Sequence, residues 1–352
     1  MAKKLSGKAI FNIVSLTVPI GFIIYFFMSE NGLIDLSEKL TSFNWIWILI
    51  GVLCQFGNVA IDSYVLFRFT NNYDKNYTLA KAIKATVVGQ FYSVITPGAV
   101  GGQPMQIYCM RKQNVDMGVA SSSLVQKFLV YQTTITLYSL IASLCNFDLF
   151  QGNMSEIMLT LAVFGFVSHA VVIVILYMFS FNRKWTKSVI GGIFNFLSKI
   201  KIIKNPEEKS ENITNQLEFF HQSNTNLYKN KKMLVITCLL TIMQLTLIFF
   251  IPYAIYRAFN FQGAKPFDMI TGQAFVTMVS SFMPLPGGSG AAEGSFYIFF
   301  SMFFTQDTIK SAILIWRIIT YFLNIIVFAP FSRIGNKYEI KESLETIKHS
   351  EE

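Results

Sequence analysis

Long apolar stretches separated by short polar segments dominate this chain. Each is close to the ~20 residues with which a helix crosses ~30 Å of hydrocarbon. Six such spans are predicted, at about 9–29, 45–67, 117–145, 156–180, 233–257 and 310–331. The first follows a cluster of lysines like a signal peptide, but no small-x-small cleavage site comes after it, so an uncleaved anchor is expected. The pattern predicts an all-α polytopic membrane protein.

Two further apolar stretches are interrupted by proline and glycine. TPGAVGGQP occupies 96–104 in the first, and PLPGGSGAAEG occupies 284–294 in the second. Backbone groups left out of a helix are costly in hydrocarbon, so such a break must lie outside the bilayer or be shielded by protein. The half-segments flanking the breaks are too short to cross comfortably, which favours two re-entrant helical hairpins. These halves run over 79–95, 104–112, 267–283 and 291–304.

Charge indicates the orientation of the spans. The net charge is +9 at pH 7 but only 14% of residues are charged, which argues against a soluble globule. With the N-terminus inside, most Lys and Arg fall in cytoplasmic segments, namely 68–84, 111–112, 181–232 and the tail after 331. This is the positive-inside asymmetry. A multi-pass plasma-membrane protein with both termini in the cytoplasm is therefore expected, without nucleic acid as a partner. The excess of Lys over Arg, with abundant Ile and Asn, indicates a bacterial source.

One membrane domain is expected over 1–331, followed by a charged cytoplasmic tail at 332–352. Its longest polar segment is the loop 181–232. Within 207–228, Ile213, Leu217 and Phe220 recur at helical spacing among charged and amide residues. A short amphipathic helix on the cytoplasmic membrane surface is predicted there.

The two breaks share the pattern P-G-small-x-G-small. In the orientation above, the first hairpin enters from the cytoplasm and the second from outside. Broken helices at corresponding places of an inverted repeat point to a transporter's binding site, and half-helix N-termini attract anions, phosphate included. The alternative is that these glycines only allow tight helix packing. The predicted break residues are Pro97, Gly98, Gly101, Gly102, Pro104, Pro286, Gly287, Gly288 and Gly290.

Ionisable residues inside spans are functional candidates by default because they are costly there. Lys127 lies about ten residues into its span, roughly 15 Å deep by helical rise, and is expected to face the bundle interior. Arg317 lies in the last span, and Glu293 follows the second break. Asp62 lies near the cytoplasmic end of its span, where simple solvation is the alternative.

Two interpretations of these residues are compatible with each other. In the first, they form internal ion pairs, Glu293 with Arg317 for instance, that hold hairpins against spans. In the second, Lys127 and Arg317 bind a lipid phosphate while Glu293 or Asp62 meets a headgroup amine. An ion pair for which a ligand competes satisfies both.

Weaker polar signals lie in the same spans. Lys310, Arg317 and Asn324 are spaced by sevens, which predicts one polar stripe. A second polar face is predicted where Asp62 follows two side-chain amides. His169 lies in an apolar segment, and a packed or hydrogen-bonded histidine is favoured over a proton relay.

No pattern in the chain indicates catalysis. The sequence contains no nucleotide-binding loop, no DxD, no HExxH and no G-x-S-x-G, and its four cysteines form no CxxC pair. We therefore expect no catalytic residue, metal or cofactor, and energy for transport would come from a gradient or from the lipid's own concentration difference.

Two stretches carry a resemblance to a known family. ITPGAVGGQPMQIYCMRKQNVDMGVASSSLVQKFL and SSFMPLPGGSGAAEGSF resemble the signature stretches of the lysylphosphatidylglycerol synthase transmembrane family, over roughly 10–331. That family includes the flippase region of the multiple peptide resistance factor, which protects against antimicrobial peptides. The resemblance implies a flippase-like fold that moves a phospholipid, aminoacylated in some members, between leaflets. It also implies a separate lipid-modifying transferase as a partner, and it leaves a homo-oligomer open.

One position departs from the family pattern. Where many members carry an acid after the double glycine, this chain has Gln103. If that acid reads a cationic headgroup, this protein is expected to prefer a neutral or anionic one. Two other functions stay open: a membrane enzyme of the phosphatidylglycerol lysyltransferase type, and a small-solute secondary transporter.

Overall fold

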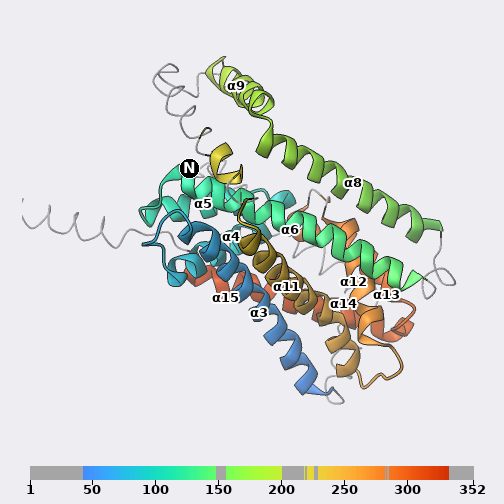
Figure 1. Cartoon of the computed structure of the whole chain (residues 1–352). Coiled ribbons are helices and arrows are strands. Elements are labelled where there is room, and N and C mark those ends of the chain that lie inside the picture. Colours follow the sequence, from blue (N-terminus) through green and yellow to red (C-terminus); the bar gives the residue numbers. More distant parts are fainter. Residues whose placement is uncertain are drawn as a thin grey trace, which may run out of the picture.

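The computed structural model describes residues 43–147, 156–199, 218, 220–225, 229–281, 283 and 285–332. Within these residues, five helical runs are long and apolar enough to cross a membrane (Figure 1). They coincide with the predicted spans, which confirms an all-α polytopic membrane protein, while the span predicted at 9–29 lies outside the described residues. The runs are α3 (Trp45–Asn71), α6 (Met117–Cys145), α8 (Glu156–Phe181), α11 (Lys231–Ala258) and the run Gln306–Phe331.

The last of these runs is not a uniform helix. It begins as α14 (Gln306–Arg317), widens to a π turn (η4, Ile318–Phe322), continues as α15 (Leu323–Phe328) and ends in a short 3-10 turn (η5, Ala329–Phe331). A π turn inside an α-helix is rare and frequently marks a functional site. Here it follows directly after Arg317.

The first broken stretch folds as a helical hairpin. It consists of α4 (Leu79–Ile95), the turn η2 (Pro97–Ala99) and α5 (Gly102–Lys112). The side chain of Gln113, just after α5, donates a hydrogen bond to the carbonyl of Lys81 at the start of α4 (3.1 Å). Both ends of the hairpin therefore lie on the same side of the bundle, as the re-entrant prediction requires.

The second hairpin has the same construction. It consists of α12 (Pro266–Ser280), the turn η3 (Pro286–Gly288) and α13 (Ala291–Phe300). Tyr256, near the end of α11, receives the backbone N–H of Ala264 (3.4 Å) before α12 and packs edge-on against Phe304 (5.7 Å between ring centroids) after α13. Entry and exit of this hairpin thus meet at one end of α11.

The two halves of the chain are inverted relative to each other. Each half contains a long helix, a broken hairpin and a second long helix. The leading helices run antiparallel, since Asn44 before α3 donates to the carbonyl of Ala258 at the end of α11 (3.0 Å). At the other end, residues from Arg68 to Lys75 and from Asn230 to Met233 surround one pocket. The hairpins therefore enter from opposite ends, and their turns η2 and η3 pack against each other between the long helices.

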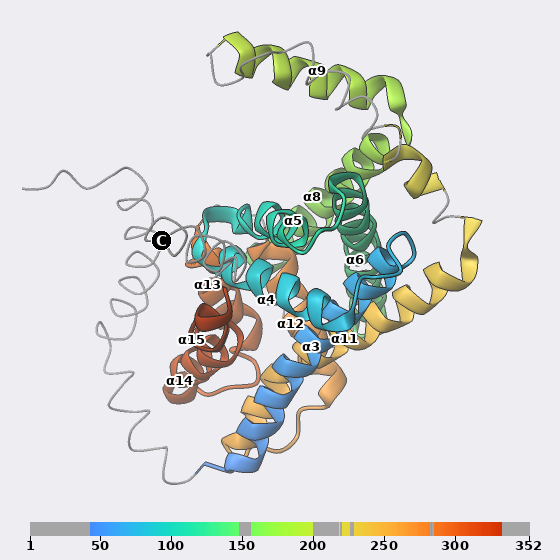
Figure 2. The same ribbon diagram turned by 90° about the vertical axis from the view of Figure 1, so that its left-hand side faces the viewer.

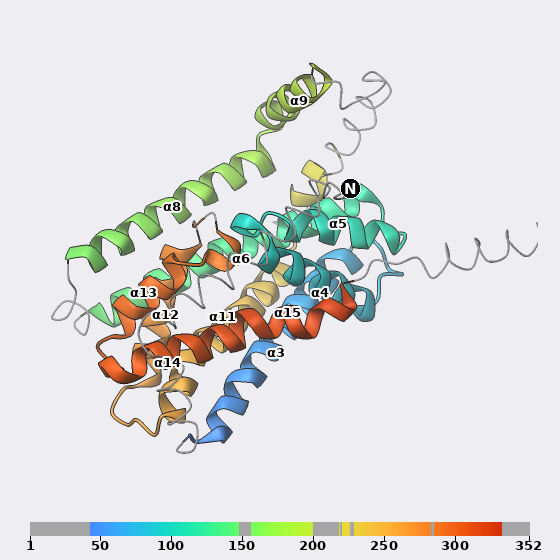
Figure 3. The same ribbon diagram turned by 180° about the vertical axis from the view of Figure 1, so that it is seen from behind.

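Helix α8 runs along one side of this bundle and packs against α6 and α12 (Figure 3). Its outer face consists of exposed apolar side chains, including Val163, Val167 and Val174, as expected of a lipid-facing surface. It continues into α9 (Arg183–Lys199), which projects from the end of the bundle (Figure 2). The sequence predicted one short helix in the segment 181–232, within 207–228, and α9 is a further helix that was not predicted.

The reason for the missed helix lies in its sequence. Apolar residues recur at helical spacing in α9, but Gly191 and Gly192 interrupt its middle and lower helix propensity. The amphipathic helix predicted within 207–228 lies mostly outside the described residues, with Ile213 and Leu217 among those left out. Its described part is helical around Phe220, whose ring packs against Phe179 of α8 (5.5 Å).

Candidate functional site

A cavity of about 900 Å³ lies where the two break turns meet. Both breaks line it with backbone, through Gly98 and Gly102 from the first hairpin and Gly287 from the second. The rest of the wall comes from the four hairpin helices α4, α5, α12 and α13, from α3, α6, α8 and α11, and from the last span. Four of the five predicted site residues line this one cavity: Asp62, Gln103, Lys127 and Arg317.

One face of α3 supplies a row of polar side chains to the wall. Gln55, Asn58 and Asp62 are spaced by three and four residues, so they project from one side of the helix. All three line the cavity and all three are buried. Gln55 donates to Asn324 of α15 (2.9 Å), and Asn58 accepts from Gln244 of α11 (3.0 Å). The amides thereby fix α3 against two other helices.

Asp62 forms the third link of this row. Its carboxylate accepts a hydrogen bond from the Lys127 ammonium of α6 at 2.8 Å. The side chains are 14% exposed for Lys127 and 8% for Asp62, so Lys127 faces the interior as predicted. The alternative that Asp62 is simply solvated is wrong, because α6 covers it. Within the described residues Asp62 is the one acceptor of this ammonium, which leaves further N–H donors of a residue that lines the cavity.

Arg317 forms a tighter pair with Glu293, which confirms the predicted partner. Its Nε donates to Glu293 Oε1 (2.7 Å) and its Nη1 to the Gly287 carbonyl (2.9 Å). The other carboxylate oxygen of Glu293 accepts the backbone N–H of Gly290 (2.7 Å). The side chains are 5% and 2% exposed. The pair therefore fastens both sides of the second break to the last span, and Glu293 itself does not line the cavity.

Arg317 nevertheless retains binding capacity. Its Nη2 is buried and has no hydrogen-bond partner among the described residues. The guanidinium lines the cavity and lies 5.1 Å from the ring of Trp316 and 5.5 Å from that of Tyr321. A buried donor without a partner is unfavourable. The charge of the guanidinium favours an anion in the cavity, although Nη2 itself is covered by neighbouring atoms.

The two cations hold corresponding positions in the inverted repeat. Lys127 lies about three turns after the start of α6 at Met117. Arg317 lies at nearly the same distance from the start of α14 at Gln306. In the second half the acid comes from the first turn of α13, as Glu293. The corresponding turn of α5 carries Gln103, an exposed amide that lines the cavity. Asp62 on α3 supplies the missing acid, so the first pair is not fastened to its break.

The half-helices after the breaks open into the same cavity. Gly102, Gln103 and Pro104 at the start of α5 line it, as does Ala292 at the start of α13. Free backbone N–H groups and the positive end of the helix dipole favour anions at such places. Lys127, Arg317 and these two helix starts thus place several groups that favour an anion around one cavity.

Glycine is required at both breaks. Gly98 and Gly287 adopt φ of +59° and +61°, the left-handed region that favours glycine. A Cβ at Gly287 would also collide with the ring of Tyr321. The remaining predicted break residues lie in or beside these turns. Pro97 and Pro286 are the first residues of the turns, and Pro104 lies in the first turn of α5. Gly101 and Gly102 pack on Thr96 and Ser93, and Gly288 and Gly290 have positive φ.

Some residues that line the cavity were not predicted from the sequence. Gln244, Gln273 and Tyr131 line the cavity from apolar helices. A polar side chain in an apolar helix is the sequence feature from which they could have been predicted. His169 hydrogen bonds to Gln132, which confirms a hydrogen-bonded histidine, and both line the cavity. The predicted polar stripe was only partly right, because Arg317 and Asn324 line the cavity whereas Lys310 does not.

The cavity lies within a region that matches a known family. The family model described as the lysylphosphatidylglycerol synthase TM region matches residues 12–327. The chain belongs to this family. The lysylphosphatidylglycerol synthase TM region thus includes both hairpins and the cavity between them, and the protein is a multi-pass membrane protein. The orientation with both termini in the cytoplasm stays a prediction.

Two proteins similar to this chain match most of its length. A "UPF0104 membrane protein" of Archaeoglobus fulgidus is 20% identical over 305 residues, 85% of this chain and 88% of the relative. An "Uncharacterized protein MG306 homolog" of Mycoplasma pneumoniae is 22% identical over 309 residues, 81% of this chain and 76% of the relative. Neither relative's name states an activity.

Proposed function

We propose that this protein moves phospholipid headgroups between the two leaflets of the membrane. The observation that carries the proposal is the placement of two deep cations and two half-helix N-termini around one polar cavity. A headgroup in that cavity leaves water without losing all its polar contacts. The acyl chains stay in lipid throughout.

The chemistry of the cavity suits a phosphate. Lys127 has N–H donors beyond the one given to Asp62, and the buried Nη2 of Arg317 has no partner within the described part of the chain. Charge-assisted hydrogen bonds from such groups to phosphate are roughly twice as strong as neutral ones. The volume of about 900 Å³ lies within the roughly 300–1,000 Å³ of ligand pockets, so a headgroup larger than phosphate also fits.

The two ion pairs take different roles in this proposal. Arg317 with Glu293 stays closed because it holds the second break, through Gly287 and Gly290. Lys127 with Asp62 opens, since neither residue is fastened to a break and both line the cavity. The pair keeps both charges stabilised while the cavity is empty. An arriving phosphate competes for Lys127, and a headgroup hydroxyl or amine competes for Asp62.

The headgroup class follows from the acid that is absent. Gln103 leaves the first half-helix without a carboxylate, and Asp62 is already engaged by Lys127. Among the described lining residues of the cavity, two are cations and one, Asp62, is a carboxylate that Lys127 already engages. This favours an anionic or neutral headgroup such as phosphatidylglycerol over an aminoacylated, cationic one. A separate lipid-modifying transferase, if present in the cell, would act on the same lipid pool.

The proposal is tested with purified protein in liposomes that contain a phospholipid with a fluorescent headgroup. Dithionite quenches the label in the outer leaflet, and a translocator lets the inner-leaflet label follow. We expect quenching to proceed well beyond the outer-leaflet fraction without tRNA or nucleotide, and faster for the anionic headgroup than for a lysylated one. Protein-free liposomes and liposomes with an unrelated membrane protein are the controls.

Two outcomes would replace the proposal. If the protein matches empty liposomes for several headgroups but forms aminoacyl-lipid when aminoacyl-tRNA is supplied, it is an enzyme of the phosphatidylglycerol lysyltransferase type. If it moves a water-soluble organic anion and no lipid, it is a small-solute transporter.

A further inference from the structure

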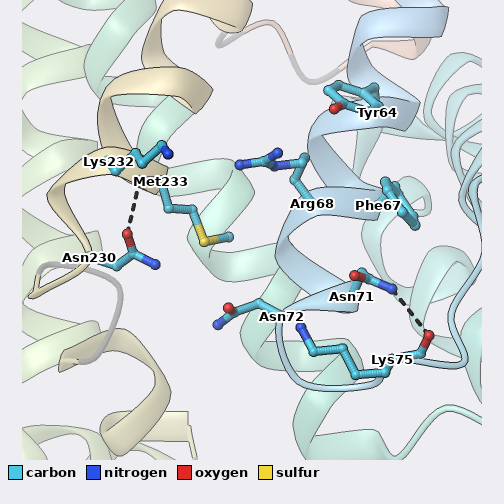
Figure 4. A pocket seen from close by; sticks show the side chains of 9 residues that line it. All are labelled: Tyr64, Phe67, Arg68, Asn71, Asn72, Lys75, Asn230, Lys232 and Met233. Atoms are coloured by element: carbon cyan, nitrogen blue, oxygen red, sulfur yellow. Dashed lines mark hydrogen bonds between the residues drawn. The ribbon is translucent and has the colours of Figure 1, made fainter.

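A second pocket lies at one end of the bundle, away from the cavity. It has a volume of about 360 Å³ and lies between the C-terminal end of α3 and the N-terminal end of α11. It shares no lining residue with the central cavity. Its lining consists of Tyr64, Phe67, Arg68, Asn71, Asn72, Lys75, Asn230, Lys232 and Met233 (Figure 4).

Three cations from three segments converge on this pocket. Arg68 of α3 and Lys232 of α11 extend toward each other across the gap between the helices, and the Lys75 ammonium turns back from the loop toward Asn72 (Figure 4). No carboxylate is among the lining residues. The carboxylate of Asp74 in the same loop accepts the backbone N–H of Asn76 (3.0 Å) instead.

Helix capping explains only part of this charge. Arg68 lies in the last turn of α3, where a cation offsets the negative end of the helix dipole. Lys232 lies in the first turn of α11, where the dipole disfavours a cation. A bound anion between them would reverse that penalty, because it would meet both a lysine and the positive end of a helix. Three cations also exceed what the half charge of one helix end requires.

The neutral residues of the pocket add donors and an apolar edge. The Oδ1 of Asn230 caps the N–H of Met233 (3.1 Å), which leaves the amide N–H groups of Asn230 available. Asn71 is already engaged, because it donates to the carbonyls of Lys75 and Tyr77 (3.3 and 3.1 Å) and so holds the loop in place. Tyr64, Phe67 and Met233 provide apolar surface beside the donors. Phosphate with an attached apolar stem matches this combination.

The position of the pocket identifies the source of the phosphate. It lies at the end of the bundle from which the first hairpin enters, on the side predicted to be cytoplasmic. Juxtamembrane cations attract anionic lipids of that leaflet, and basic pockets between membrane helices bind their headgroups. We infer that this pocket binds the phosphate of an anionic phospholipid from the adjacent leaflet, as a site separate from the translocation cavity.

The test measures how anionic lipid stabilises the full-length protein in nonionic detergent. Thermal unfolding is followed while phosphatidylglycerol, phosphatidylcholine or inorganic phosphate is added. The pocket variant is Arg68→Gln with Lys232→Gln. The matched control is Lys184→Gln with Lys187→Gln, which removes the same charge from exposed positions on α9. Repeating the titrations in a Lys127→Ala background removes the contribution of the central cavity.

Phosphatidylglycerol is expected to raise the unfolding temperature in a saturable manner, and phosphatidylcholine is not. The pocket variant should need about tenfold more phosphatidylglycerol for half the effect, while the control variant titrates like wild type. If the double variant does not fold, Lys75→Gln against Lys184→Gln gives the same comparison with a smaller shift. Equal titrations of the pocket and control variants would overturn the inference. An equal, saturable effect of inorganic phosphate would replace the lipid by free phosphate.

Discussion

The pair Arg317–Glu293 allows the most detailed prediction, because both charged groups have hydrogen-bond partners that the structure describes. The perturbation is a double-mutant cycle with Glu293→Gln, Arg317→Gln and the double variant. Arg317→Gln removes the donor to the Gly287 carbonyl. Among the described residues it leaves the buried Glu293 carboxylate with the Gly290 N–H alone. Glu293→Gln retains an oxygen for Gly290 but leaves the guanidinium charge uncompensated. We therefore expect Arg317→Gln to be the worse single variant.

The magnitude follows from the burial of the pair. Removing one member of a buried, hydrogen-bonded pair costs ~3–5 kcal/mol, because the remaining charge is left without compensation. The double variant leaves no charge behind. A coupling free energy of ~3 kcal/mol, the upper end for residues in contact, is expected. The double variant should then lose ~3 kcal/mol less than the sum of the two single losses.

The assay is reversible unfolding by a denaturing detergent, followed by circular dichroism. The control cycle uses Arg183 and Glu218, whose groups are 3.8 Å apart with side chains 53% and 52% exposed. Exposed pairs contribute ~0–1 kcal/mol, so this cycle should show almost no coupling. Additive losses for Glu293 and Arg317 would refute the reasoning, because additivity means that the two charges do not compensate each other.

Two further predictions concern the breaks and the headgroup. Gly98→Val and Gly287→Val should abolish lipid translocation but leave membrane insertion normal, because both positions have positive φ. The control Gly191→Val in α9, where a side chain meets open space, should translocate lipid normally. Normal translocation by both break variants would contradict the role of the broken helices. Gln103→Glu should shift headgroup preference toward lysylphosphatidylglycerol by up to about fivefold, the equivalent of ~1 kcal/mol for a partly solvated ion pair. Competition between labelled lipids measures this preference. An unchanged preference would mean that this position does not contact the headgroup.

The parts of the fold that could be predicted from the sequence depend on local rules. Span length follows from the thickness of hydrocarbon, and each Pro-Gly break follows from the cost of unpaired backbone groups. The Glu293–Arg317 pair could also be predicted, because Glu293 lies directly after the second break and Arg317 lies in the next helix along the chain. By contrast, α9 was missed because two adjacent glycines weaken a pattern that is otherwise helical.

The parts that could not be predicted depend on contacts between distant segments. Lys127 could be placed inside the bundle from its depth in the span, whereas for Asp62 solvation stayed open. Only the packing of α3 on α6 shows that the two residues pair. The sequence also showed that an acid is absent at Gln103, without showing that α3 supplies a replacement. Gln244 and Gln273 are neutral, so they carry a weaker signal than a buried charge although they line the same cavity.

The central claim is that the cavity between the breaks carries the headgroup, and the translocation rate of Lys127 variants tests it most directly. Wild type, Lys127→Ala and Lys127→Arg are compared in the same dithionite assay, with unfolding measured in parallel. Lys127→Ala should slow translocation more than its loss of stability explains, and Lys127→Arg should keep part of the rate because the cation remains near Asp62. If Lys127→Ala translocates at the wild-type rate while folding normally, the headgroup does not pass through this cavity.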